Sequence, residues 1–318
     1  MSPTTTAAAL PPVQRPFPVL APYRTTPAPR PMDGPPLIVD DAWPAARQRR
    51  LERLRDDRDG VLVRDPDDPD DAGLLAALRA AARLLPVTHP CKDAVECTQP
   101  DDCTQPDDRT QPDDRTQPDD RTQPDDRTQP DDADEPLALA EAWLLACSDD
   151  LVVLRRRGPA RATAELLAVA FPSGWPPRER AGADLPALHA PVADGERLRA
   201  ASGALTEALL VKGPFSQHVW GLDPDGRLDR DPSAPDAAPH TCPPPDQWWL
   251  RVERQTSLPL PELDRALFLI RPHLVPLTAL DAGRRRVLHD AVASMGDQAL
   301  AYKGLTQVRD DLLAWLVS

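Results

Sequence analysis

Apolar residues recur at helical spacing towards both ends of the chain. Segment 42–57 predicts a charged helix, and segment 73–85 predicts a stronger one because alanine and leucine favour helices. Residues 135–150 and 197–210 show the same period. Residues 282–318 predict two more helices, the last of which carries one apolar stripe formed by Leu305, Val308, Leu312 and Leu316.

The middle of the chain instead alternates between apolar and polar residues, as strands with one buried face do. This pattern predicts strands over 150–157, 215–222, 247–257 and 265–274, and a strand or short helix over 164–172. Gly158 and Pro159 mark a turn between two of them, and the proline-rich stretch 223–246 predicts a loop. Helices at both ends with antiparallel strands between them indicate an α+β fold.

Two parts of the chain lack any apolar period. Residues 1–36 contain eleven prolines and predict a mostly disordered or extended segment, in which RPFPVLAPYR is the part expected to lie on the folded domain. Residues 97–132 repeat the unit (C/R)TQPDD six times. That unit has no apolar residue to bury, so we expect a disordered insertion and no solenoid.

These shifts in composition divide the chain into four parts. They are the proline-rich segment 1–36, a helical N-terminal part 37–90, the repeat insertion 91–134 and the core 135–318. Gaps of five residues separate the cysteines of the insertion, so a metal site formed by Cys91, Cys97, Cys103 and His89 does not fit common zinc spacings.

The charge of −14 excludes some classes of partner. The repeat alone contributes −8, and the rest of the chain has no basic stripe, which argues against nucleic acid. The dense basic run Arg155–Arg157 reads as part of a turn between strands. We expect no secretory signal and no membrane helix. Because the number of cysteines is odd and their spacing shows no disulfide framework, we also expect a reduced, cytoplasmic setting.

The segment RVERQT is the most informative local pattern. It places three charged side chains in a strand flanked by tryptophan and leucine, which is costly unless the charges are paired. Alternation directs Arg251 and Glu253 to one face and Arg254 to the other. One interpretation is a cross-strand ion pair with Arg271. The other is a pocket in which Glu253 holds a cationic amine and an arginine holds a propionate.

A single histidine, His189, stands in the stretch LPALHAPVAD. It reads either as an ordinary buried or surface residue or as the axial ligand of a haem iron, which needs only one protein ligand. The sequence contains no GxGxxG, Walker, GxSxG or HExxH motif, so a nucleotide site is not expected within this chain.

Four blocks together resemble one family, the haem-dependent oxidative N-demethylase alpha-subunit-like proteins. The blocks are FPSGWPPRERAG at 171–182, LHAPV at 188–192, LRVERQTSLPLP at 250–261 with FLIRPHLVPL at 268–277, and SMGDQALAYKGL at 294–305. The resemblance covers residues 135–318 and does not include the hexapeptide repeat.

This resemblance implies a PAS-like sheet that binds haem b, with His189 on the iron. It implies oxygen-dependent removal of a methyl group from a secondary amine such as dimethylamine, with release of formaldehyde. External flavin and iron–sulfur reductase subunits would supply the electrons. In this interpretation Glu253 faces the amine, while Arg251, Arg254 and Arg271 hold haem propionates or pair with Glu253.

The sequence departs from the family pattern just before Trp220. Many relatives carry Arg and Asn where this chain has Gln217 and Val219, with His218 between them. His218 is therefore either a surface residue or a compensating distal group. Two other functions remain open, a non-catalytic haem sensor or storage module and a structural relative without haem.

Overall fold

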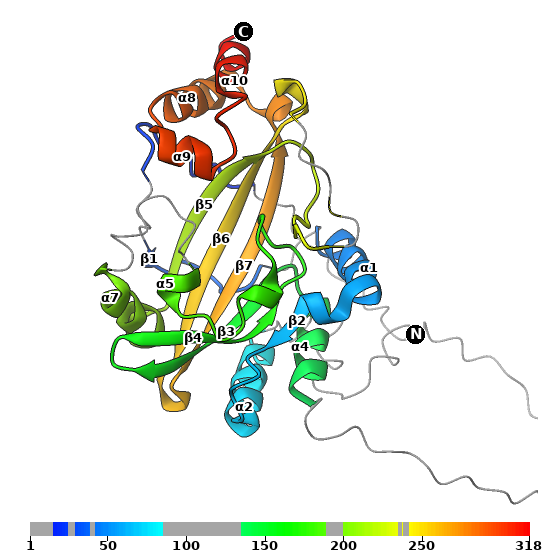
Figure 1. Cartoon of the computed structure of the whole chain (residues 1–318), viewed down its shortest axis with the longest axis vertical. Coiled ribbons are helices and arrows are strands. Elements are labelled where there is room, and N and C mark those ends of the chain that lie inside the picture. Colours follow the sequence, from blue (N-terminus) through cyan, green and yellow to red (C-terminus); the bar gives the residue numbers. More distant parts are fainter. Residues whose placement is uncertain are drawn as a thin grey trace, which may run out of the picture.

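A computed structural model describes residues 15–24, 29–38, 42–84, 135–188, 200–234, 237 and 242–318 (Figure 1). The repeat at 97–132, Cys91 before it and His189 lie outside the described residues, as do parts of the proline-rich terminus.

The centre of the fold is a single antiparallel sheet. Its seven strands run in the order β1-β5-β6-β7-β3-β4-β2. The strands are β1 (Arg30–Pro31), β2 (Leu62–Arg64), β3 (Asp150–Gly158), β4 (Arg161–Ala168), β5 (Phe215–Asp223), β6 (Trp249–Leu260) and β7 (Arg265–Pro276). The two long strands β6 and β7 pair over their whole length, from Trp249 opposite Pro276 to Leu260 opposite Arg265.

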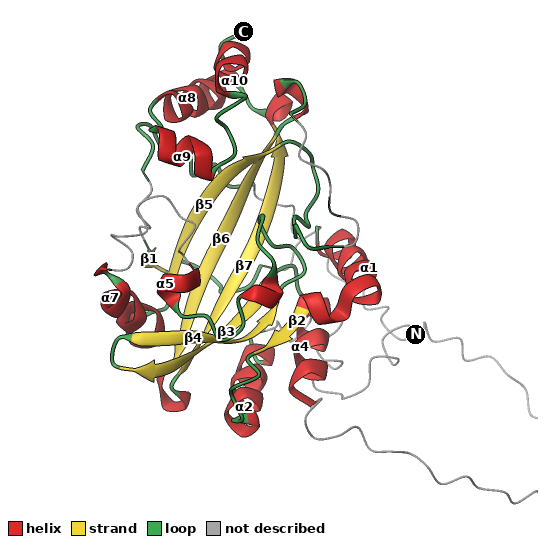
Figure 2. Ribbon diagram, in the orientation of Figure 1, coloured by secondary structure: helices red, strands yellow, loops and turns green. Residues whose placement is uncertain are grey.

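Helices gather at the two ends of the sheet, as Figure 2 shows. The α-helices are α1 (Trp43–Val61), α2 (Asp71–Ala82), α4 (Glu135–Ala146), α5 (Leu185–Leu188), α7 (Ser202–Glu207), α8 (Ala282–Ala293), α9 (Asp297–Tyr302) and α10 (Arg309–Leu316). A π-helical turn at Ala208–Lys212 follows α7 directly. Short 3-10 turns occur at Pro177–Glu179, Pro245–Gln247, Pro261–Leu263 and Leu277–Ala279.

The pairing register defines two faces of the sheet. We call one the Glu253 face, because Val219, Glu253 and Pro272 lie opposite one another across β5, β6 and β7. We call the other the Arg254 face, on which His218, Arg254 and Arg271 occupy the next rung. Side chains alternate between faces along a strand, so each neighbour of Glu253 in sequence points the opposite way.

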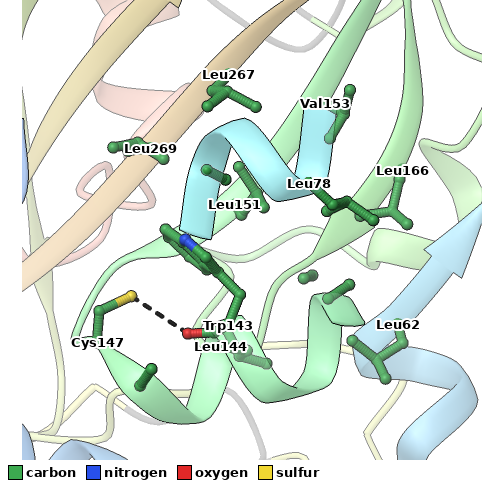
Figure 3. Close-up of a cluster of buried hydrophobic side chains, with 14 of the residues drawn as sticks. Leu62, Leu78, Trp143, Leu144, Cys147, Leu151, Val153, Leu166, Leu267 and Leu269 are labelled. Atoms are coloured by element: carbon green, nitrogen blue, oxygen red, sulfur yellow. Dashed lines mark hydrogen bonds between the residues drawn. The ribbon is translucent and has the colours of Figure 1, made fainter. Parts of the chain in front are cut away.

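Two apolar clusters cover the Arg254 face. In the first, Trp143 and Leu144 of α4 and Leu78 of α2 pack on Leu151 and Leu269 of the sheet (Figure 3). In the second, the three C-terminal helices pack on the opposite end of the same face. That cluster includes Leu250, Val252, Val275, Leu288, Leu305, Leu312 and Leu316. Burial of these leucines and valines stabilises the domain, at about 1.5–3 kcal/mol for each fully buried side chain.

A third apolar cluster lies on the Glu253 face. Val152 and Ile270 of the sheet pack there with Leu185 of α5 and with Leu209 and Leu210 of the π-helical turn. Leu188, the last residue of α5, packs against this cluster. The cluster covers only part of the face, so the rungs around Glu253 remain partly accessible.

An extended segment from the N-terminal part crosses the Arg254 face. We call residues 29–38 the strap. Its β1 pairs with the edge of β5, where Arg30 lies opposite Ser216, and Met32 donates a backbone hydrogen bond to Pro214. Leu37 of the strap is buried in the first apolar cluster. In the described part of the chain, the strap therefore belongs to the folded domain and is extended.

The α+β prediction is confirmed, and so are the four strands predicted at 150–157, 215–222, 247–257 and 265–274. Of segment 164–172, residues 164–168 form a strand, because β4 begins earlier, at Arg161, and ends at Ala168. The helix expected at 197–210 is present only as α7 and its π-helical turn, with residues 197–199 outside the described part. Residues 282–318 form three helices where two were expected, because the chain turns at Met295–Gly296 and again after Tyr302.

The basic run Arg155–Arg157 lies within β3 itself, and the turn follows it. The acidic loop before α2 neutralises Arg155 and Arg157, whereas Arg156 points to Glu207 and Asp264. Arg155 and Arg157 both pair with the buried Asp68, and Arg155 also lies 3.2 Å from Asp70. Hydrogen bonding and charge from these arginines lower the pKa of Asp68 against the opposing effect of burial. Among the described helices, none has the length and apolar character needed to span a membrane.

Candidate functional site

Glu253 lies at the middle of the three long strands that form the centre of the sheet. Val219 of β5 and Pro272 of β7 flank it on either side. Its side chain retains 13% of its possible exposure, so the carboxylate is largely but not fully withdrawn from solvent. Along its own strand, the same face presents Arg251 and Gln255.

Hydrogen bonds hold both oxygens of this carboxylate. Ser173, in the loop after β4, donates its hydroxyl to Oε1 of Glu253. Gln255 donates from Nε2 to Oε2 at 3.0 Å. The Nε atom of Arg251 lies 3.8 Å from Oε1. Partners on two sides thus fix the orientation of the carboxylate, and they leave it with lone pairs for a further donor.

The hydrogen-bonded chain continues from Gln255 to the next strand. Gln217 of β5 donates from Nε2 to Oε1 of Gln255 at 2.9 Å. The other end of this amide, Oε1 of Gln217, is buried and has no hydrogen-bond partner within the described structure. The Glu253 face thus carries an ordered row of polar groups that ends in an unused acceptor.

Arg251 ties two loops to the sheet. Its NH2 group donates to the carbonyl oxygens of Phe171 at 2.8 Å and Leu228 at 2.9 Å, and its Nε donates to Ser173. Its NH1 group lies 3.5 Å from the Asp223 carboxylate, whose pKa is raised by burial and lowered by this guanidinium. Arg251 therefore connects both loops to the carboxylate through Ser173.

Lys303 brings a second cation to the edge of the same strands. Its Nζ donates to the backbone oxygen of Trp220 at 2.5 Å. It also lies 5.0 Å from the centre of the Trp220 ring, 5.3 Å from that of Tyr23 and 5.9 Å from that of Tyr302. Burial lowers the pKa of Lys303 to about 8, against the opposing charge of Glu253. The lysine connects the C-terminal helices to β5 through cation–π contacts.

The other two predicted arginines lie on the Arg254 face. Arg254 donates to the strap carbonyls of Pro36 at 3.0 Å and Pro35 at 2.8 Å. Arg271 donates to Ile38 of the strap at 2.8 Å. The structure therefore brings Arg251 to Glu253, whereas Arg254 and Arg271 point away from it, and a cross-strand pair of Glu253 with Arg271 is not formed.

The rest of this arginine cluster is also directed away from Glu253. Asp149 lies 3.5 Å from Arg271, and burial raises the pKa of Asp149 to about 6. His273 is buried on the same face, and burial lowers its pKa to about 3, so its ring is neutral at pH 7. His218 is exposed on that face, in agreement with the surface interpretation.

The sequence identified Glu253 and Arg251 but not their partners. Ser173 and Lys303 lie inside two of the sequence blocks that resemble the family, and nothing else in the sequence indicates that they lie near Glu253. Gln255 could have been found from its alternation with Glu253. Gln217 was noted as a departure from relatives, and the structure places it in the polar row of Glu253.

Apolar side chains adjoin this row of polar groups. Val219, Phe268, Pro272 and Leu274 share the Glu253 face and are only partly buried. A charged carboxylate and a free amide oxygen next to partly exposed apolar surface suit a ligand that has both a cationic and an apolar part.

The chain matches a known family. The family model described as "Haem-dependent oxidative N-demethylase, alpha subunit-like" matches residues 114–313 of the 318. The matched range contains β3 to β7, α8, α9 and every residue of the polar row described above.

Proposed function

We propose that this chain, which belongs to the haem-dependent oxidative N-demethylase, alpha subunit-like family, is the subunit that binds a small amine and demethylates it. The observation that carries the proposal is the Glu253 carboxylate, held by Ser173 and Gln255 beside partly exposed apolar surface. Such a group binds an alkylammonium ion through a charge-assisted hydrogen bond.

The side chains on the Glu253 face are of the kinds that a haem contacts. A porphyrin needs apolar contacts on its faces and polar partners at its edge. The Glu253 face offers the apolar contacts in its partly buried side chains, and Lys303, at the edge of the same strands, is a cationic donor of the kind that a propionate needs. The haem, which we propose to be haem b in a PAS-like sheet, would supply oxygen activation. The amine substrate class and the release of formaldehyde belong to the same proposal.

His189 remains our proposed iron ligand. It lies outside the described residues, but it directly follows Leu188, which packs on the Glu253 face. Of the histidines in the described part of the chain, His218 and His273 lie on the opposite face, and His289 of α8 lies 2.8 Å from Asp290. These positions support His189 over the described histidines.

The arginines divide into two proposed roles. Arg251 acts next to the site, because it anchors the loops that carry Ser173 and Leu228. Arg254 and Arg271 donate to backbone carbonyls of the strap. We therefore assign them to holding the strap, because a haem propionate would need the same guanidinium donors. Electrons would come from separate flavin and iron–sulfur reductase subunits, and the family's description as an alpha subunit supports such partners.

The first experiment compares the variants His189→Ala, His289→Ala and Glu253→Gln with the wild type. We expect a Soret band in the wild-type protein and in His289→Ala after haem supplementation, and a lost or shifted band in His189→Ala. Glu253→Gln should keep its haem and bind dimethylammonium about tenfold to a hundredfold more weakly, since it loses one charge-assisted contact.

Three results would contradict the proposal. No Soret band in supplemented wild-type protein would favour a structural relative without haem. An unchanged band in His189→Ala would remove the ligand assignment. Haem binding without any amine binding or turnover, in the presence of reductase and oxygen, would favour a sensor or storage module.

A further inference from the structure

Gly221 lies inside β5, where a glycine weakens the strand. It has no side chain to pack, and it loses more conformational freedom on folding than any other residue. β5 pairs with β6 residue by residue from Phe215 to Asp223, so Gly221 marks no bulge or sharp bend. Its φ lies outside the left-handed region that glycine adopts most readily. The backbone therefore does not require a glycine at this position.

Crowding does not require a glycine there either. A Cβ atom built on Gly221 would meet no atom within 4 Å in the described part of the chain, apart from its own neighbours in sequence. At Gly226, by contrast, a Cβ atom would lie 2.8 Å from the ring of Trp249. Glycines inside strands mark bulges, bends or places where a backbone or a ligand approaches closely. Because neither the pairing nor a neighbouring backbone accounts for Gly221, the approach of a ligand is the remaining reason.

The open space over Gly221 belongs to the Glu253 face. Gly221 and Val219 point to the same face of β5, and Val219 lies opposite Glu253. Arg251 lies opposite Gly221, and Leu274 of β7 follows in the same rung. Val219 and Leu274 are apolar side chains that are only partly buried. The space is thus one rung from Glu253, and apolar surface adjoins it.

Lys303 supplies a cation at the edge of the sheet next to this space. It directly follows α9, which lies beside β5 in Figure 1. Its Nζ atom donates to the backbone oxygen of Trp220, in the peptide that joins Trp220 to Gly221. An ammonium group has three N–H donors, and Lys303 forms no ion pair within the described structure. It therefore keeps donors for a carboxylate that a ligand brings to this edge.

These two features suit a flat ligand with carboxylates on one edge, and a haem is such a ligand. A flat ring gains its contacts with a strand at about 3.5–4 Å, and a side chain beneath the ring would prevent them. We propose that the propionate edge of the haem lies over Gly221, with one propionate bound to Lys303. This inference rests on the proposed function, in which the haem binds to the Glu253 face.

The variant Gly221→Val tests the space over β5. Haemin is titrated into the haem-free full-length protein, and the Soret band reports binding without any turnover. Valine favours strands and its Cβ meets no neighbour, so the melting temperature of the haem-free variant should stay the same or rise. Haem affinity should fall at least about tenfold. Gly221→Ala should show a smaller loss. Gly296→Ala, at an exposed position where an added Cβ also meets no atom within 4 Å, is the matched control and should bind haem as the wild type does.

The variant Lys303→Met tests the propionate contact. Haem dimethyl ester has the same ring as haem but no carboxylate, and the wild type should bind it about tenfold to a hundredfold more weakly than haem. Lys303→Met should bind haem only as tightly as the ester, so that this preference disappears. Lys303→Arg keeps the cation and should keep the preference. Lys212→Met, at an exposed position, is the control and should behave as the wild type does.

The outcomes separate this inference from the proposed function. If the wild type binds no haem, both fail. If the wild type binds haem and folded Gly221→Val binds it equally well, only the inference is refuted, and Gly221→Ala decides in the same way should the valine variant not fold. Normal haem affinity with weakened dimethylammonium binding in Gly221→Val would assign the space to the amine and would also refute it. A preference for haem over its ester that survives in Lys303→Met, or that is missing in the wild type, overturns the propionate contact and with it the inference.

Discussion

The hydroxyl of Ser173 donates a hydrogen bond to Glu253, a residue 80 positions further along the chain. The same hydroxyl accepts a hydrogen bond from Arg251. One small side chain in a loop thus links a buried guanidinium to the carboxylate that we assign to the amine. The orientation of that carboxylate depends on a loop as well as on its own strand.

Replacing Ser173 with alanine should weaken amine binding without removing haem. Glu253 loses one of its two donors, so we expect about a fivefold to tenfold loss of dimethylammonium affinity by calorimetry. The unfolding free energy should fall by about 1–3 kcal/mol, because Nε of Arg251 loses its acceptor. Ser173→Thr keeps a hydroxyl and is the control. Unchanged amine affinity in Ser173→Ala would show that the hydroxyl does not orient Glu253.

Replacing Arg254 with methionine should loosen the strap. The carbonyl oxygens of Pro35 and Pro36 lose their donors, and the backbone hydrogen bond of Met32 should then open more often. Hydrogen exchange of the peptide that covers residues 29–38 should accelerate, while haem content stays constant. Arg49→Met, at an exposed position of α1, provides the control. A fall in haem content with unchanged exchange would instead support the propionate role.

The sequence predicted most of the fold because its long elements have a clear apolar period. The alternation along β6 placed Glu253 and Arg254 on opposite faces correctly. The short strands β1 and β2 have two and three residues, which is too few for any period to show. Their pairing depends on tertiary contacts, and local pattern cannot supply these.

The candidate site was predictable only in part, for a similar reason. A charged residue inside an apolar strand is conspicuous, so Glu253 and Arg251 could be found. The partners of Arg254 and Arg271 are backbone carbonyls of the strap, and a carbonyl gives no sequence signal at all. Ser173 is one of many serines until the fold brings its loop to β6.

Deleting the repeat Cys97–Asp132 should leave the folded domain unchanged. The repeat has no apolar residue to bury, so its removal should change the unfolding free energy by no more than about 0.5 kcal/mol. Thermal unfolding of the deleted and full-length proteins, with haem content measured in both, checks this. A large fall in melting temperature or in haem content would show that the repeat contacts the domain.

His273 should make the protein sensitive to acid. Burial lowers its pKa in the folded state to about 3, against an ordinary value of 6.5, so the unfolded chain binds a proton more readily between these values. The contribution of the neutral His273 ring to the free energy of unfolding is therefore fully present above pH 6.5, and it is lost as the pH falls towards 3. At pH 5 this loss amounts to about 2 kcal/mol.

Replacing His273 with glutamine should flatten this dependence, because the variant has no proton to take up at that position. Urea unfolding at several pH values between 4 and 7 should give a smaller loss of stability for His273→Gln than for the wild type. His289→Gln, at a partly exposed position of α8, should follow the wild-type curve. The buried Asp149 works in the opposite direction, because its raised pKa favours the folded state as the pH falls below about 6. The quantity to compare is therefore the difference in unfolding free energy between His273→Gln and wild type at each pH. If the unfolding free energy of the two proteins depends on pH with the same slope, the assignment to His273 is refuted.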